Sequence, residues 1–278
     1  MVLGGVELFT GEGGSVSSRV LEAVESSPAM EAWLGGIKRM WDVLPSGDTG
    51  GKISHLAVIC DGNRRAAEAR RLPKHWGHRA GLEVILGIAG AGKKWGIDNL
   101  TFWIWSTGNW KRDSEQIEFV MTMAKEYLRD PRILNNLREN QAKFRHMGRK
   151  DRLPQEVVQA LGELERKTAG FGERTLSIAM DYGGVDEVQR AVEKMFTLGA
   201  VVPQAILGYL DTVGLPDPEL VIRTGEEEGI MKHTSGFLPL QTSDAAWAFV
   251  PDFFPDLTPE GLKGIIGQFL GYGMRKGK

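Results

Sequence analysis

From residue 53 onward, short apolar runs alternate with amphipathic helical runs, and this alternation limits the fold more than any other feature of the chain. The apolar runs have the length and β-branched content of buried strands. Strands that alternate with helices predict an α/β fold, with one mostly parallel sheet and helices on both faces. The expected strands are 53–60, 99–105, 143–148, 175–180 and 220–224, and the expected helices are 79–95, 114–128, 154–168, 186–197, 203–211 and 258–270.

Polar segments follow four of the expected strands. They read "DGNRR" (61–65), "STGNWKR" (106–112), "DYGG" (181–184) and "RTGEEEG" (223–229). Ligands of parallel sheets lie beyond the carboxyl ends of the strands, so these segments are the candidate site. Two of the four are cationic, which favours an anionic ligand.

The first of these segments joins a strand directly to a helix. Residues from Arg64 onward are strong helix formers, and a helix start offers unpaired N–H groups to an anion. A carboxylate such as Asp61 can face a second anion only with a cation between them, and Mg²⁺ commonly bridges one carboxylate to phosphate oxygens. Arg64 and Arg65 add planar donor forks that suit phosphate. The junction predicts a magnesium diphosphate site, and a capped helix with solvated arginines is the alternative.

Composition narrows the class of protein. The 278 residues, 42% of them hydrophobic, can bury a sizeable core, and a formal net charge of -2 gives no general attraction to nucleic acid. The single cysteine, Cys60, excludes an internal disulfide and a cysteine zinc cluster, which fits a reducing compartment. No apolar run is long enough to span a bilayer. We expect a cytoplasmic protein.

The first 50 residues are expected to form an N-terminal extension, and residues 51–278 the main domain. The extension has an amphipathic helical pattern from Arg19 to Leu44, broken by "PSGDTGGK". Its apolar face is expected to pack on the main domain, with peripheral membrane contact as the alternative. A second motif, "GIAGAGKK" (87–94), resembles half of a phosphate-binding loop, but Lys94 replaces the required Ser or Thr and the motif ends a helical run.

Five ordered motifs resemble those of one enzyme family. They are "HLAVICDGNRR", "LPKHWGHRAG", "WSTGNWKR", "DYGGVDEVQRAV" and "LVIRT". From about Ile53 to the C-terminus the chain resembles the cis-prenyltransferases, the undecaprenyl and dehydrodolichyl diphosphate synthases. The resemblance implies a six-stranded parallel sheet flanked by helices that enclose a hydrophobic tunnel. It also implies a homodimer, or a heterodimer with a related partner, that uses Mg²⁺ to join isopentenyl diphosphate to an allylic diphosphate with a cis double bond.

The resemblance also implies roles for individual residues. Asp61 matches the catalytic, magnesium-binding aspartate, and Asn109 matches an asparagine that positions the condensing substrate or assists proton removal. Further matches concern substrate binding: Gly62, Asn63, Arg64, Arg65, Lys74, His78 and Arg112 for the allylic diphosphate; Ser106 and Trp110 for the second motif; and Arg223, His233, Ser235, Arg275 and Gly277 for isopentenyl diphosphate. The tail residues Arg275 and Gly277 could serve the neighbouring subunit.

Several positions depart from the family pattern. Lys74 and His233 stand where arginines are usual, and Ala246 stands where a magnesium-holding glutamate is usual. Asp244 or the cluster Glu226–Glu228 could substitute for that glutamate, or the cluster could be a solvated loop. These departures leave two alternatives open: a catalytically weak partner subunit, and an irregular coupling or cyclising homologue.

The strand sequence "FWIWS" bears on product length. Alternation places Phe102, Ile104 and Ser106 on one strand face, and Ile104 lies where makers of long chains have a small residue. Volume there would block a growing chain. The sequence therefore predicts a short product of a few isoprene units.

Overall fold

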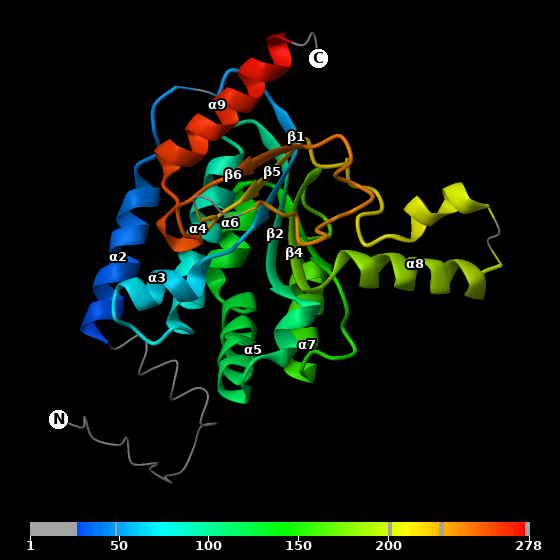
Figure 1. The fold of residues 1–278 in the computed structure, drawn as a ribbon, viewed down its shortest axis with the longest axis horizontal. Helices are drawn as coiled ribbons and strands as arrows, with labels where there is room; N and C mark the ends of the chain where they lie inside the picture. Colours follow the sequence, from blue (N-terminus) through cyan, green and yellow to red (C-terminus); the bar gives the residue numbers. More distant parts are fainter. Residues whose placement is uncertain (1–26, 48, 200–201, 228–230, 276–278) are drawn as a thin grey trace.

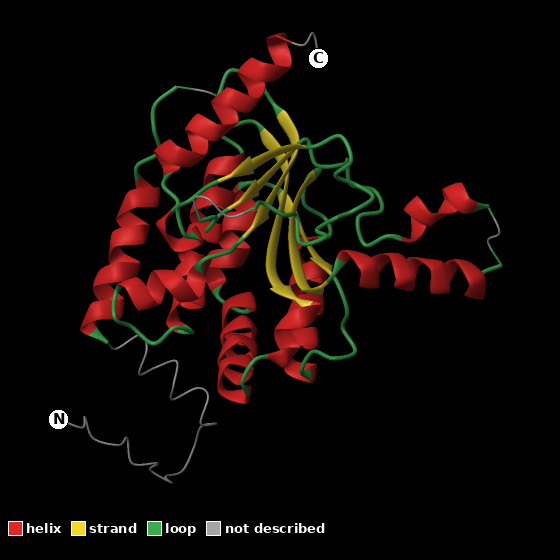
Figure 2. Cartoon of the chain, in the orientation of Figure 1, coloured by secondary structure: helices red, strands yellow, loops and turns green. Residues whose placement is uncertain are grey.

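The computed structural model describes residues 27–47, 49–199, 202–227 and 231–275, and in these residues one six-stranded sheet forms the centre (Figures 1 and 2). The strand order is β3-β4-β2-β1-β5-β6, and every neighbouring pair is parallel. The α/β class and the six-stranded parallel sheet are thus confirmed. The strands are β1 (Ile53–Ile59), β2 (Ile97–Ser106), β3 (Ala142–Met147), β4 (Arg174–Tyr182), β5 (Leu220–Arg223) and β6 (Ala246–Phe249).

The helices follow the predicted alternation closely. They are α2 (Pro28–Asp42), α3 (Asn63–Ala69), α4 (Trp76–Gly92), α5 (Ser114–Leu128), α6 (Pro131–Glu139), α7 (Gln155–Thr168), α8 (Gly184–Thr197) and α9 (Pro259–Arg275), with short 3₁₀ helices η1 (Thr107–Lys111), η2 (Pro203–Tyr209) and η3 (Phe254–Asp256). The rejected phosphate-loop motif lies largely inside α4, as its helical pattern indicated. Helix α6 was not predicted from the sequence pattern, and no residues were predicted for β6.

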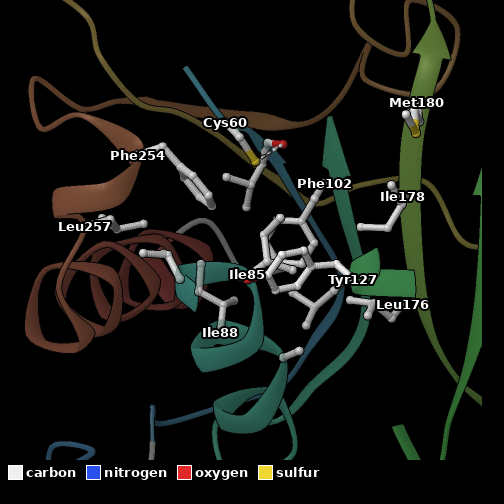
Figure 3. Close-up of a cluster of buried hydrophobic side chains, with 14 of the residues drawn as sticks. Cys60, Ile85, Ile88, Phe102, Tyr127, Leu176, Ile178, Met180, Phe254 and Leu257 are labelled. Carbon is white, nitrogen blue, oxygen red and sulfur yellow. Dashed lines mark hydrogen bonds between the residues drawn. The ribbon is translucent and has the colours of Figure 1, made fainter. Parts of the chain in front are cut away.

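The main hydrophobic core lies between one face of the sheet and the helices that cover it. Figure 3 shows Ile85 and Ile88 of α4 beside Phe102 of β2 and Tyr127 of α5 in this core. Phe102 and Ile88 are fully buried. Apolar side chains of the described residues pack together in this layer, and the tunnel stays a prediction.

The opposite face of the sheet is covered differently. Its smaller core contains the loop residues Phe237 and Leu238, with Phe237 stacked on Trp103 at a ring-centroid distance of 4.9 Å. Helix α8 projects away from the body and η2 folds back beside it (Figure 1). The expectation of helices on both faces is therefore correct only in part. Several apolar side chains of this projecting segment are exposed: Val185, Phe196, Leu198, Val202, Leu207 and Val213.

Helix α2 packs on the main domain. Its buried side chains Met30, Leu34, Ile37 and Trp41 belong to the main core. Trp41 lies against α4 where a Cβ at Gly87 would come within 2.3 Å of its ring, so glycine permits the contact. Most of the predicted apolar face is thus covered by protein. Among the described helices, none combines the length and apolar character that crossing a membrane requires.

Strand β2 is irregular near its carboxyl end. Trp103 pairs with Ala179 and Trp105 pairs with Met180, so Ile104 is an extra residue of a β-bulge. The bulge turns the fully buried Trp105 into the same core as Phe102. The strict alternation expected for "FWIWS" is therefore wrong at Trp105.

Candidate active site

A cavity of about 670 Å³ lies at the carboxyl ends of the central strands. The ends of β1, β2 and β5 line it together with the segments that follow them, because parallel strands bring their carboxyl ends to one edge. Eleven of the predicted residues are among those that line it: Asp61, Gly62, Asn63, Arg64, Arg65, His78, Ser106, Asn109, Arg112, Arg223 and Ser235.

The turn at Gly62 and Asn63 fixes one wall of the cavity. Gly62 has φ +92°, and a Cβ there would lie 2.7 Å from Cδ1 of Phe253. The Asn63 amide donates to the carbonyl of Cys60 over 2.7 Å, which ties the helix start to the strand end. Gly77 and Gly81 of α4 lie so close to Asn63 that any side chain there would clash. Burial raises the pKa of the Cys60 thiol, as expected of a core residue.

Asp61 stands between the two groups of arginines. One carboxylate oxygen accepts from the backbone N–H of Gly62 over 2.6 Å, and the other accepts from Arg223 over 2.9 Å. Its side chain is 40% exposed, so the carboxylate remains accessible from the cavity. Arg65 lies 3.6 Å from the same carboxylate.

Arg64, Arg112 and His78 form one part of the cavity wall, which we call the open half. Across the described ranges, no carboxylate pairs with Arg64 or Arg112 within ion-pair distance. Burial, together with the charge of Arg64, lowers the pKa of the Arg112 guanidinium. Burial and the charges of Arg112 and Arg64 lower the pKa of His78 to about 3. Two cations held together beside a neutral imidazole favour the binding of an anion.

Arg65 and Arg223 form the other part, which we call the paired half. Arg223 contacts Asp61 and forms a close ion pair with Glu226, and both the Arg223 and Glu226 side chains are 9% exposed. Arg65 pairs with Glu227 at 2.8 Å and donates to the carbonyl of Gly225 over 2.7 Å. The cluster that the sequence left open as a metal site or a solvated loop thus neutralises arginines through its two described members.

Ser235 and His233 complete the surroundings of Arg223. Arg223 donates to the Ser235 hydroxyl over 2.6 Å and to the backbone carbonyl of His233 over 3.1 Å. The His233 ring nitrogen Nδ1 lies 3.1 Å from that hydroxyl. The structure therefore brings these three predicted residues together.

Asn109 lies in η1, and one of its two side-chain polar atoms is already hydrogen-bonded within the turn. Its Oδ1 accepts from the backbone N–H of Ser106 over 2.9 Å, and the Ser106 side chain accepts from the backbone N–H of Asn109. The reciprocal cap leaves the amide Nδ2 to donate. An amide whose oxygen is bound can orient a ligand oxygen but is a poor proton acceptor.

Several other predicted residues lie elsewhere. Lys74 and Trp110 are not among the described residues that line the cavity. Trp110 instead donates its Nε1–H to Asp181 over 2.8 Å. Arg275 is the last residue of α9, its side chain is not described, and Gly277 lies outside the described residues. Phe269, Leu270 and Tyr272 of α9 line a separate pocket at the amino ends of the strands. Within one chain, α9 thus runs away from the cavity.

Ala246 and Asp244 also belong to the far end of the sheet. Ala246 begins β6 and pairs with Leu220, whereas Arg223 at the cavity pairs with Phe249. Asp244 lines the separate pocket near the amino ends of the strands. Asp244 as a substitute magnesium ligand beside Asp61 is therefore wrong, because the length of a strand separates the two.

Several residues that line the cavity were not predicted from the sequence. Thr107 and Gly183 line it, and a Cβ at Gly183 would lie 2.7 Å from the Thr107 hydroxyl. Glu68 of α3 lines it as well. Thr107 and Gly183 belong to polar segments that follow strands, so their position after strand ends was the available signal.

Comparison with known proteins agrees with this geometry. The family model described as "Putative undecaprenyl diphosphate synthase" matches residues 59–277. The chain belongs to the cis-prenyltransferase family. The curated isoprenyl transferase of Agrobacterium fabrum is 35% identical over 223 residues, covering 77% of this chain and 88% of that protein. The isoprenyl transferase of Treponema denticola is 32% identical, covering 78% and 94%.

Solved structures of cis-prenyltransferases share the fold. The lavandulyl diphosphate synthase of Lavandula x intermedia, solved in complex with dimethylallyl diphosphate, has a TM-score of 0.72 at 25% identity, covering 78% of this chain and 95% of that one. The "probable undecaprenyl diphosphate synthase" of Campylobacter jejuni has a TM-score of 0.63 at 27% identity, covering 79% and 96%. This chain is accordingly a prenyltransferase of the same fold.

The residues present fit a magnesium ion of the kind the family implies. Asp61 presents an accessible carboxylate, and oxygen ligands of this kind suit Mg²⁺. Within the described part of the chain, no group of three His, Cys, Asp or Glu side chains could form a metal cage. Mg²⁺ usually keeps water and phosphate oxygens beside one or two carboxylates, so a single aspartate facing a diphosphate site is an adequate donor set.

Proposed function

We propose that this chain condenses isopentenyl diphosphate with an allylic diphosphate in a Mg²⁺-dependent reaction and releases a short Z-polyprenyl diphosphate. One observation carries the proposal: two arginines, Arg64 and Arg112, which no carboxylate of the described residues neutralises by an ion pair, line the cavity together with the accessible carboxylate of Asp61. Cations that repel one another in the absence of ligand become favourable neighbours when a polyanion lies between them.

The open half would hold the allylic diphosphate. The allylic carbon–oxygen bond breaks only if the charge of the departing diphosphate is stabilised, and Arg64 and Arg112 supply that stabilisation through charged N–H donors. His78 is kept neutral by burial and by the charges of the same arginines, which lower its pKa to about 3. Its Nε2 lies 3.4 Å from Nη1 of Arg112 and accepts from it, which helps to hold the guanidinium in the cavity wall. Bound magnesium would supply further charge to the diphosphate, and Asp61 would hold it there.

The paired half would hold isopentenyl diphosphate. Arg223 and Ser235 lie next to each other there, with His233 behind them. Asn109 Nδ2 would orient this substrate so that its double bond faces the allylic carbon, which is positioning work. Since the Oδ1 of Asn109 is bound by its own turn, we assign positioning rather than proton removal to this residue.

Product length is proposed to be short. Ile104 lines the cavity, and Trp105 and Phe102 are fully buried behind it. These side chains occupy space toward which a growing chain would extend. Chromatography of a reaction with farnesyl diphosphate should give a few added units, and products of ten or more units would contradict this part of the proposal.

A homodimer is proposed as the working form, with heterodimers as the alternative. The exposed apolar side chains on and after α8, among them Phe196 and Leu198, support a protein partner there. Residues Phe269, Leu270 and Tyr272 of α9 line the separate pocket at the amino ends of the strands, and we propose that Arg275 serves a neighbouring subunit. Cytoplasmic location, with or without peripheral membrane contact, also remains part of the proposal.

The experiment is an assay of the purified chain alone. Magnesium, radiolabelled isopentenyl diphosphate and geranyl or farnesyl diphosphate are supplied, and incorporation into extractable lipid is measured. We expect turnover that chelation of magnesium abolishes. A chain that shows no turnover until a related partner is added would be the weak partner subunit instead.

A second candidate is the irregular coupling of two dimethylallyl units. The similarity to a lavandulyl diphosphate synthase favours it. The ion pair between Arg223 and Glu226 also favours it, because this pair makes the proposed isopentenyl diphosphate position differ in charge from the allylic one. The mass of the product decides between the two: a ten-carbon product from dimethylallyl diphosphate alone would favour irregular coupling.

A further inference from the structure

Asp181 is a buried carboxylate that the proposed reaction does not use directly. It lies in β4 next to the carboxyl end, its residue is fully buried, and its φ of +52° is in the left-handed region. One oxygen accepts from Nε1 of Trp110 over 2.8 Å, and the other accepts from Nε of Arg152 over 2.9 Å. Arg152 reaches the carboxylate with a second nitrogen as well. A buried carboxylate is costly unless it is paired in this way.

The backbone at Asp181 is fixed independently of these contacts. Its carbonyl accepts from the backbone N–H of Arg149 over 3.0 Å. Gly148 passes so near that a Cβ there would lie 2.7 Å from the same carbonyl oxygen. The position of the side chain therefore does not depend on the ion pair alone. A change of carboxylate to amide should leave the local fold in place.

Trp110 connects this carboxylate to the reaction centre. It follows Asn109 in η1, and its ring meets Trp105 edge-on at 5.8 Å between centroids. Trp105 in turn lies under the Arg112 guanidinium at 5.2 Å. The indole N–H is the only polar group of the Trp110 side chain. It donates to Asp181 and does not point into the cavity.

We propose that Asp181 is a positioning residue for prenyl transfer: through the indole N–H of Trp110 it fixes the turn that presents Asn109 and Arg112 to the two diphosphates. The inference rests on the proposed function. Asp181 touches no substrate in this account. Its effect arises because a small displacement of a catalytic turn can cost about a hundredfold in rate.

The test removes the donor of this hydrogen bond in one variant and weakens its acceptor in the other, with the side-chain shapes kept. Trp110→Phe keeps a ring and deletes the N–H, and Asp181→Asn keeps the shape and deletes the charge. We expect kcat to fall about tenfold to a hundredfold in Trp110→Phe and by a smaller factor in Asp181→Asn, whose neutral amide oxygen accepts more weakly from the indole. The double variant should fall no further than Trp110→Phe, because both changes act on one contact. Thermal midpoints show whether each variant folds, and kcat is compared only among variants that melt cooperatively.

Trp41→Phe is the matched control. Trp41 is also buried, but its Nε1 has no hydrogen-bond partner among the described residues. The same substitution there should leave kcat unchanged. Independent losses that multiply in the double variant, or unchanged kcat in Trp110→Phe and Asp181→Asn, would overturn the inference.

A spectroscopic readout separates this inference from the proposed function. In a spectrum of ¹⁵N-tryptophan-labelled protein, the indole signal that Trp110→Phe removes should shift in Asp181→Asn and stay in place in Trp41→Phe. If that signal does not shift, the contact is refuted whatever the activity. If the unaltered chain shows no turnover, the proposed function fails instead, and the role of Asp181 in prenyl transfer falls with it.

Discussion

The two halves of the cavity hold two arginines each but differ in what surrounds them. In the open half, Arg64 and Arg112 line the cavity near a neutral His78, and burial raises the cost of the Arg112 charge. In the paired half, the carboxylates of Glu226 and Glu227 already neutralise Arg223 and Arg65. The open half is organised for a polyanion before one arrives. In the paired half an incoming diphosphate must replace a carboxylate or join it through a cation.

Asp61 contacts Arg223 and Arg65 of the paired half and is also the proposed magnesium ligand for the diphosphate of the open half, so its loss should have the largest effect. We expect Asp61→Asn to lower turnover by about a thousandfold or more, since removing one element of electrostatic stabilisation alone costs about a hundredfold to a thousandfold. Incorporation of labelled isopentenyl diphosphate measures it. Asp98→Asn is the control, because Asp98 lies near the amino end of β2 and is 45% exposed. If Asp61→Asn keeps turnover within tenfold of the unaltered chain, Asp61 is not the residue that serves both diphosphate positions.

Arg112 should matter more for anion binding than any paired arginine. Hydrogen bonds to charged groups contribute about 1.5–3 kcal/mol, so Arg112→Gln should weaken the binding of inorganic diphosphate by about tenfold to a hundredfold. Titration calorimetry without magnesium measures it. Arg138→Gln on α6, where Arg138 bonds only to a neighbouring asparagine among the contacts described, should leave binding unchanged. A loss of less than twofold in Arg112→Gln would remove the distinction between the halves.

His78 gives the open half a pH dependence. Its folded pKa of about 3 lies below the ordinary value of 6.5, so the unfolded chain binds protons first and stability is lost as pH falls from 6.5 toward 3. At pH 5 this contribution is about 2 kcal/mol. Denaturant unfolding at pH 7 and pH 5 should therefore show a smaller drop in His78→Gln than in the unaltered chain. Equal drops would mean that His78 is not held neutral.

Glu227 should produce the smallest effect. Its side chain is 58% exposed, and exposed pairs contribute less than about 1 kcal/mol. Glu227→Gln should release Arg65 and lower KM for isopentenyl diphosphate about twofold to fivefold, with KM for the allylic substrate unchanged. Glu173→Gln, at an exposed position far from the cavity, is the control. A rise in KM would show that Glu227 assists binding rather than competing with it.

The fold was largely predictable because its signal is local. The spacing of hydrophobic residues predicted five of the strands and most of the helices. Helix α5 begins and ends at the predicted residues. Strand β6 reads "AWAF" and is only half-buried, so it lacks the fully buried, β-branched run that marked the equally short β5. Helix α6 carries a polar sequence with one buried residue, Leu137. The sixth strand was expected only through the family resemblance.

The grouping of the site was predictable because parallel strands place their ends together. What could not be predicted depends on contacts between distant residues. The bulge at Ile104 reverses Trp105, the indole of Trp110 turns to Asp181, and Glu226 pairs with Arg223. None of these leaves a pattern in the sequence, since each is set by three-dimensional register and by which charge lies nearest.

The most direct test is a crystal structure of the chain with Mg²⁺ and a non-hydrolysable allylic diphosphate analogue. The account predicts diphosphate oxygens within hydrogen-bond distance of both Arg64 and Arg112, with a metal ion bound to the carboxylate of Asp61. A diphosphate seated elsewhere, or bound in this cavity while Asp61 stays paired with Arg223 and holds no metal, would contradict it.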